Sequence, residues 1–210
     1  VPVAAMRGDH FIVRDETARR TIGGGVILRP SAPKRRRSDP ALLPTLEAYA
    51  HGDDSAVIEA LVADSGEFAI ALSTLAQLLN DREERVRTRA AAVRGLHTFV
   101  LEGDTFYATE RACADVKARV LAATGAWHKA KALSPGLETE DARLAVPSHP
   151  PVRLFRMLVD ELERDQAIAR DGSALRLPSH AVQVAGRDRV VSDRILAALS
   201  AAPPGPPDLK

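Results

Sequence analysis

Positively charged side chains gather at two places in the first 37 residues, and both could bind phosphate groups. Three arginines flank a short polar stretch between two predicted strands, and four cations follow in a proline-containing segment. They are Arg14, Arg19, Arg20, Lys34, Arg35, Arg36 and Arg37. Such groups can pair with a nucleic-acid backbone, and the binding would depend strongly on salt. Exposed surface without a ligand and a solubilising linker explain the same residues equally well.

The net charge of the chain conceals this concentration. The net charge is +1, but the segment up to Arg37 holds nine Lys or Arg against three Asp or Glu. The remainder holds 20 against 25 and is therefore acidic. Contact with a polyanion is thus expected near the N-terminal end.

A further group of arginines lies in the predicted helix from Asp81 to Arg94. Its position matches the recognition helix of a winged-helix DNA-binding module, which enters the major groove. Glu83 and Glu84 lie among these arginines, however, and the surrounding sequence is acidic. A solvated or interdomain face is therefore the preferred interpretation. The corresponding helix of the second module, 151–165, is more acidic still and is a poor candidate for groove binding.

Other patterns that could do chemistry favour structural roles. Gly23–Gly25 lead into an apolar run with no Lys or hydroxyl at the offset of a phosphate-binding loop, so they predict a bulge or tight bend. Cys113 is the single cysteine, which excludes a disulfide within the chain or a thiolate zinc site and fits a reducing compartment. We expect no catalytic residue, no metal and no cofactor on this chain. The histidines, none at metal-ligand spacing, are His10, His51, His97, His128, His149 and His180.

The elements that would position the basic residues begin with two strands. Alternating apolar residues predict a strand over 8–15, and a second strand is predicted over 21–28, entered through a flexible or bulged glycine segment. Two strands alone are not a stable unit, so this piece needs neighbours upstream of Val1. Residues 29–39 then have the composition of a solvated connector.

The remaining sequence is mainly helical, and the aromatic content is only 4%. Helices are predicted after Ser38 or Asp39 with Pro40 at the first position, after Asp54, after Ser73 and over 81–94, followed by a hairpin over 96–107. This order is typical of a winged helix.

The order then repeats, with helices over 110–131, after Thr139 and over 151–165, and with a hairpin over 168–177. The hairpin turns at Gly103 and Gly172 lie 69 residues apart, which indicates a tandem repeat. A last helix over 189–202 would bury Ile195, Leu196 and Leu199 in a third module that the chain does not complete. The predicted fold class is mainly α with small β elements: tandem winged-helix modules preceded by the last strands of a β-barrel domain.

Several strings carry a resemblance to a known family. Gly8-Asp9-His10-Phe11-Ile12-Val13-Arg14-Asp15, followed by residues 18–30, closely resembles the last strands of the third domain in translational GTPases related to elongation factor Tu. With the basic connector and the winged-helix repeats, the chain resembles the selenocysteine-specific member, and 127–137 and 175–180 resemble the opening and close of that family's second winged helix. Arg29 departs from the acidic residue expected there, and Ser179 from a glycine.

The resemblance implies a division into 1–30 as the end of the barrel domain, 31–39 as a basic linker, 40–109 and 110–180 as winged helices, and 189–210 as the start of a third. The complete factor would bind GTP, with Mg²⁺, and selenocysteinyl-tRNA, and deliver the tRNA to the ribosome at a recoded UGA codon. The mRNA selenocysteine-insertion hairpin would be held mainly by the last winged helix, which this chain lacks.

The chain itself would then be a fragment without enzymatic activity. It would contribute tRNA-facing barrel strands, through residues such as Arg19 and Arg20, and a spacer between tRNA and the mRNA hairpin. A cytoplasmic location is expected, with no membrane partner, because no apolar stretch approaches the roughly 20 residues needed to cross a bilayer.

Two alternatives remain open. A winged-helix transcription regulator would place residues 82–94 on DNA, but it leaves residues 1–30 unexplained. A pure structural spacer differs from the first reading only in whether the basic segment touches RNA.

Overall fold

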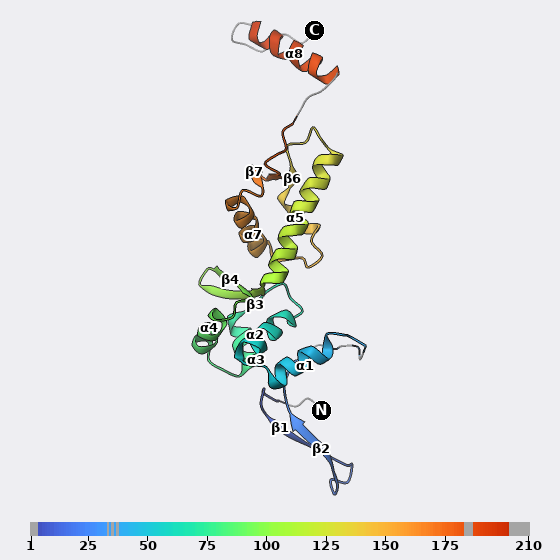
Figure 1. Cartoon of the computed structure of the whole chain (residues 1–210), viewed down its shortest axis with the longest axis vertical. Coiled ribbons are helices and arrows are strands. Elements are labelled where there is room, and N and C mark those ends of the chain that lie inside the picture. Colours follow the sequence, from blue (N-terminus) through green and yellow to red (C-terminus); the bar gives the residue numbers. More distant parts are fainter. Residues whose placement is uncertain (1–3, 33, 35, 37, 183–186, 202–210) are drawn as a thin grey trace. The chain divides into compact units, whose positions relative to one another are not determined.

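The computed structural model of the chain describes residues 4–32, 34, 36, 38–182 and 187–201. These residues fall into two compact units, one formed by 1–117 with 147–158 and the other by 118–146 with 159–210. The long helix α5 (Glu110–Ala130) and the helix α7 (Val152–Arg164) each contribute residues to both units. Figure 1 labels those elements for which there is room.

The first unit begins with an antiparallel pair of strands, β1 (His10–Arg14) and β2 (Thr21–Val26), in which every residue is exposed. The three glycines lie inside β2, and the irregularity in register falls at Ile22, beside Gly23, because Val13 pairs with Gly23 and Arg14 with Thr21. The predicted bulge is therefore displaced from the glycines. A Cβ on Gly24 would lie 2.6 Å from the carbonyl oxygen of Phe11, so the close approach of the two strands requires glycine there.

The first winged-helix module follows in the same unit. It comprises α1 (Leu42–His51), α2 (Asp54–Ala63), β3 (Ile70–Ala71), α3 (Leu72–Leu79), α4 (Glu83–Ala91), β4 (Leu96–Leu101) and β5 (Asp104–Thr109). The three strands form an antiparallel sheet in the order β3-β5-β4. The buried core includes Ile58, Leu61, Leu75 and Val86, all with no exposed surface.

Local side-chain chemistry sets the helix boundaries in this module. Asp53 caps α2 by accepting a hydrogen bond from the backbone N–H of Ala56, and Asn80 ends α3 in the left-handed conformation, with φ 53°. The prediction for α1 is wrong by two residues, because α1 begins at Leu42 rather than Pro40. Asp39 instead accepts from the N–H of Ala41 at 2.9 Å, which forms a separate turn ahead of the helix.

The second winged-helix module repeats this order, except that the single long helix α5 precedes its first strand. After α5 come β6 (Leu137–Glu138), α6 (Thr139–Leu144), α7, β7 (Ala169–Asp171) and β8 (Ala174–Arg176), with the sheet order β6-β8-β7. In both sheets the first short strand pairs with the last strand of the module, and Gly103 and Gly172 occupy the hairpin turns at φ 92° and 61°. The predicted fold class is confirmed, whereas the residue boundaries of the modules stay predictions.

The last described helix, α8 (Arg187–Ala201), departs from the sequence expectation. Ile195, Leu196 and Leu199 were expected to be buried, yet they are 54%, 57% and 52% exposed. Their spacing therefore identifies an apolar face of the helix, but this face is exposed. Residues 202–210 of the predicted third module lie outside the described residues. None of the helices in the described part of the chain has the length and apolar character needed to span a membrane.

Candidate RNA-facing surface

The tip of the β1–β2 hairpin is built around Asp15. Its carboxylate oxygen Oδ1 accepts hydrogen bonds from the backbone N–H groups of Arg19 and Arg20, at 3.0 and 3.3 Å, and from the Thr17 hydroxyl, at 3.1 Å. The Asp15 N–H donates to the Arg20 carbonyl at 2.9 Å. A short acidic side chain thus closes the turn by bonding the backbone that follows it.

The protonation of Asp15 reflects this arrangement. Its pKa is lowered, first because the backbone N–H of Arg20 donates to it, and then because Thr17 and the backbone N–H of Arg19 donate as well. The carboxylate is therefore ionised at neutral pH, and it keeps its turn-closing role there.

The turn presents the three predicted arginines to solvent, since Arg14, Arg19 and Arg20 are all exposed. Arg14 Nη1 donates to the carbonyl oxygen of Ala18 at 3.2 Å and so supports the turn. Ala18 itself adopts a left-handed conformation, with φ 54°. Asp15 fixes the backbone N–H groups of Arg19 and Arg20, and this leaves the two guanidinium groups as the side chains best placed to meet a polyanion.

The basic connector is described only in part. Lys34 and Arg36 are exposed, and the carbonyl of Arg36 accepts from the N–H of Asp39 at 3.1 Å. The predicted candidates Arg35 and Arg37 lie outside the described residues. Whether any of these side chains contacts RNA stays a prediction.

Arg29 corrects the expectation of a solvated connector over 29–39. Its side chain is 8% exposed and forms an ion pair with Asp64, whose side chain is 5% exposed. The sequence reasoning also missed Arg7, which donates to the backbone carbonyls of Leu28 and Tyr49. Nothing in the local sequence indicates these contacts, because the partners lie 21 to 42 residues apart.

The arginine-rich helix α4 uses part of its charge within the module. Arg89 pairs with Asp54 and Asp81, at 2.8 and 2.9 Å, and Arg85 lies 3.5 Å from Asp81. The pKa of Asp81 is lowered, mainly because the backbone N–H of Arg82 donates to it and further because both arginines lie close. The two arginines are therefore partly neutralised by acidic residues of the same module.

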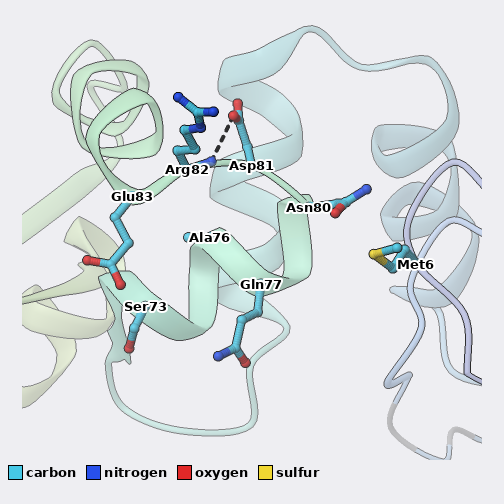
Figure 2. Close-up of a pocket in the computed structure, with 8 residues that line it drawn as sticks. All are labelled: Met6, Ser73, Ala76, Gln77, Asn80, Asp81, Arg82 and Glu83. Atoms are coloured by element: carbon cyan, nitrogen blue, oxygen red, sulfur yellow. Dashed lines mark hydrogen bonds between the residues drawn. The ribbon is translucent and has the colours of Figure 1, made fainter.

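An open hollow of 880 Å³ lies beside the start of α4. Met6, which precedes β1, lines the hollow together with polar side chains that include Gln77, Asn80 and Arg82 (Figure 2). The dashed contact in the figure is the hydrogen bond from the N–H of Arg82 to Asp81, at 2.8 Å. The lining of the hollow carries both signs of charge, because Glu83 lies there as well as Arg82, so the hollow shows no preference for a polyanion.

Two family models match the chain where these features lie. The β-barrel domain of the selenocysteine-specific elongation factor matches residues 1–34, and the winged helix of elongation factor SelB matches residues 121–177. The two matches support a fragment of a selenocysteine-specific elongation factor. The SelB barrel match contains the whole Asp15 turn, and the winged-helix match runs from α5 to the end of the second module's hairpin. A search of curated proteins found no match.

At the end of the second winged-helix module, aromatic rings pack against one another. His128 and His180 stack with centroids 3.6 Å apart, and His128 Nε2 accepts from the N–H of Leu177 at 3.1 Å. Trp127 Nε1 donates to the Ser134 hydroxyl at 3.1 Å. The predicted structural role of His128 fits this contact. Over the described residues, no three metal-ligating side chains come together as a metal site would require.

Proposed function

We propose that this segment of a selenocysteine-specific elongation factor is part of its RNA-binding arm. The factor would deliver selenocysteinyl-tRNA to the ribosome at recoded UGA codons. In this proposal the β1–β2 hairpin faces the tRNA, and the winged-helix modules separate the tRNA from the mRNA hairpin. That hairpin would be held mainly by modules outside residues 1–180.

The observation that carries the proposal is the hairpin tip in the segment matched by the SelB barrel. Asp15 accepts from the backbone of Arg19 and Arg20, so two exposed cations follow one ordered turn. An ordered turn loses less conformational entropy on binding than a free loop does. The exposed Lys34 and Arg36 add positive charge at the end of this segment and just beyond it.

Nucleotide chemistry is proposed to reside elsewhere in the factor. GTP and Mg²⁺ would be bound by a GTPase domain, and this chain would hydrolyse no nucleotide. The pairing of Gly23–Gly25 with β1 supports this, because these glycines serve strand contact and not a phosphate cradle. Incubating the purified chain with GTP and Mg²⁺ and measuring released phosphate tests it, since any turnover above a protein-free control would contradict it.

The RNA contact is tested by the salt dependence of tRNA binding. In the 210-residue chain, Arg19→Ser with Arg20→Ser should weaken selenocysteinyl-tRNA binding and flatten the plot of log affinity against log salt. Each lost phosphate contact lowers the slope by about 1, so the double variant should lose about 2. The matched control is Arg156→Ser with Arg164→Ser, which removes two exposed cations of α7.

If the slope falls equally in both double variants, the effect comes from net charge and not from a specific contact. An unchanged slope in the variant of Arg19 and Arg20 would refute contact by the hairpin tip. Replacing Lys34, Arg35, Arg36 and Arg37 together with Ser tests the connector separately. If that variant keeps the slope of the unsubstituted chain, the connector acts only as a spacer.

The size of the native polypeptide tests the wider context. An antibody against residues 40–180, used on the source cells, should detect a band much larger than the 22.5 kDa of this chain. A band only at 22.5 kDa would contradict the assignment to a GTP-dependent delivery factor. The alternative of a transcription regulator is not favoured by the family matches.

A further inference from the structure

Two arginines of the barrel segment reach into the first winged-helix module. Arg7 precedes β1 and Arg29 follows β2, so they stand at opposite ends of the strand pair. Both contact Tyr49 of α1, Arg7 through the backbone carbonyl and Arg29 through the hydroxyl. The segment is therefore attached to the module at two points.

The contact of Arg29 is buried and made entirely with groups of the module. Its Nη1 donates to the carboxylate of Asp64, to the backbone carbonyl of Asp64 at 2.9 Å and to the Tyr49 hydroxyl at 3.2 Å. Tyr49 in turn donates to the Asp64 carboxylate at 2.9 Å. A buried charge is tolerated only when it is paired, so the low exposure of Arg29 and Asp64 makes each dependent on the other.

The contact of Arg7 joins three parts of the chain. Nη1 donates to the carbonyl of Leu28, which lies just after β2, and Nη2 donates to the carbonyl of Tyr49, each at 2.6 Å. The Tyr49 carbonyl belongs to the last turn of α1, where cations are favoured by the partial negative charge of the helix end. The guanidinium carbon also lies 6.0 Å from the centroid of the Tyr49 ring.

We propose that Arg7, Arg29, Tyr49 and Asp64 form an interdomain clamp that makes the end of the barrel and the first winged helix one rigid body. Arg29 and Asp64 are then positioning residues, which fix where the module stands relative to the tRNA-facing hairpin. Arg29 and α1, which lie on either side of the connector, would then be fixed relative to each other. This goes beyond the proposed function, because the clamp exists without RNA.

The clamp has a consequence for the cations of the connector. Arg29 holds the chain just before the connector, and α1 begins at Leu42 on the same module. Lys34 and Arg36 are therefore confined to a loop tethered at both ends on one body. Their reach toward a polyanion is set by the clamp and not by a free linker.

The test measures a distance across the clamp by double labelling in the RNA-free 210-residue chain. Spin labels are placed at Glu16→Cys near the hairpin tip and Thr98→Cys on β4, both at exposed positions, while the native Cys113 is buried and is protected from labelling. The intact clamp should give one narrow distance distribution. Arg29→Met should replace it with a broad one, whereas Arg36→Met, which removes an exposed cation of the connector, should leave it narrow.

Arg29→Met leaves Asp64 buried without its partner and could unfold the module, so a second variant is needed. Arg7→Met removes the two 2.6 Å contacts and keeps the Arg29–Asp64 pair, and it should also broaden the distribution. The near-ultraviolet circular dichroism, to which Tyr49 and Tyr107 of the module contribute together with Trp127, reports whether the module stays folded. If Arg29→Met unfolds the module, Arg7→Met decides. A broad distribution in the parent chain, or a narrow one in every folded clamp variant, would overturn the proposal. Such a failure would leave the predicted tRNA salt slope of the Arg19 and Arg20 variant standing, because that slope is measured with separate substitutions at the hairpin tip.

Discussion

Gly136 and Gly125 offer the same chemical change with opposite expected effects in the second winged helix. At Gly136 an added Cβ would lie 2.5 Å from the carbonyl oxygen of Leu175 and 3.2 Å from the Cβ of Ala174. The adjacent Leu137 pairs with Leu175 in the sheet, so the backbone cannot retreat without losing that register. Forcing an extra methyl group into a packed site costs about 1–3 kcal/mol, and Gly136→Ala should lower the free energy of unfolding by that amount.

At Gly125, inside α5, an added Cβ would meet the Cδ1 of Leu177 at 3.6 Å, an ordinary packing distance. Alanine in a helix interior is favoured over glycine by about 0.5–1 kcal/mol, since it reduces the backbone freedom of the unfolded chain. Gly125→Ala should therefore stabilise the module. The two variants differ only in the space available around the same added atom.

Thermal unfolding followed by fluorescence measures both effects in this module, because Trp127 is the only tryptophan of the chain. For a domain of this size each kcal/mol shifts the midpoint by about 4–8 °C. Gly136→Ala should lower the midpoint by at least about 4 °C, and Gly125→Ala should raise it by about 2–8 °C. A shift of the same sign in both variants would refute the reasoning from backbone contact.

Three further predictions concern single side chains. Tyr49→Phe removes a hydroxyl bonded to the buried Asp64 carboxylate, so the first module should lose about 1–3 kcal/mol in urea unfolding followed by circular dichroism. Asn80→Ala should cost the same module about 1 kcal/mol, whereas Asn80→Gly should change it by only a few tenths, because the position has φ 53°. The pKa of His128 is lowered by burial first and then by the charges of His180 and Arg176, so the unfolded chain takes up this proton more readily. Stability of the second module should thus fall as pH drops below about 6.5, and a pH-independent Trp127 unfolding curve, or an equal fall in His128→Gln, would contradict this.

The sequence predicted the hairpins and most helices because their signals are local. Glycine at a tight turn and apolar residues at helical spacing are read within a few positions of the chain. The strands β3 and β6 were missed, since two residues carry no periodicity and these strands exist only through pairing with β5 and β8. In α8, periodicity predicted an apolar face correctly, but it carries no information about what, if anything, covers that face.

Part of the candidate site could likewise be predicted from local sequence, and part could not. The cations of the hairpin and connector were visible in the sequence, and the turn-closing role of Asp15 could have been found from an aspartate at the start of a polar turn. The pairing of Arg29 with Asp64 could not, because charge type alone does not select a partner 35 residues away. A basic run next to prolines predicted a solvated connector over 29–39. At Arg29, the first residue of that range, the tertiary contact with Asp64 overrides the prediction.

The exposed strand pair also bears on the fate of this segment in a cell. Ile12 and Ile22 are 69% and 66% exposed, and Phe11, Val13 and Val26 are each 45% exposed, so both faces of β1 and β2 carry apolar side chains. Contiguous apolar surface on a strand pair is what chaperones and proteases recognise in incompletely folded proteins. A segment that carries this exposed hairpin should therefore be cleared by protein quality control faster than the winged-helix modules alone.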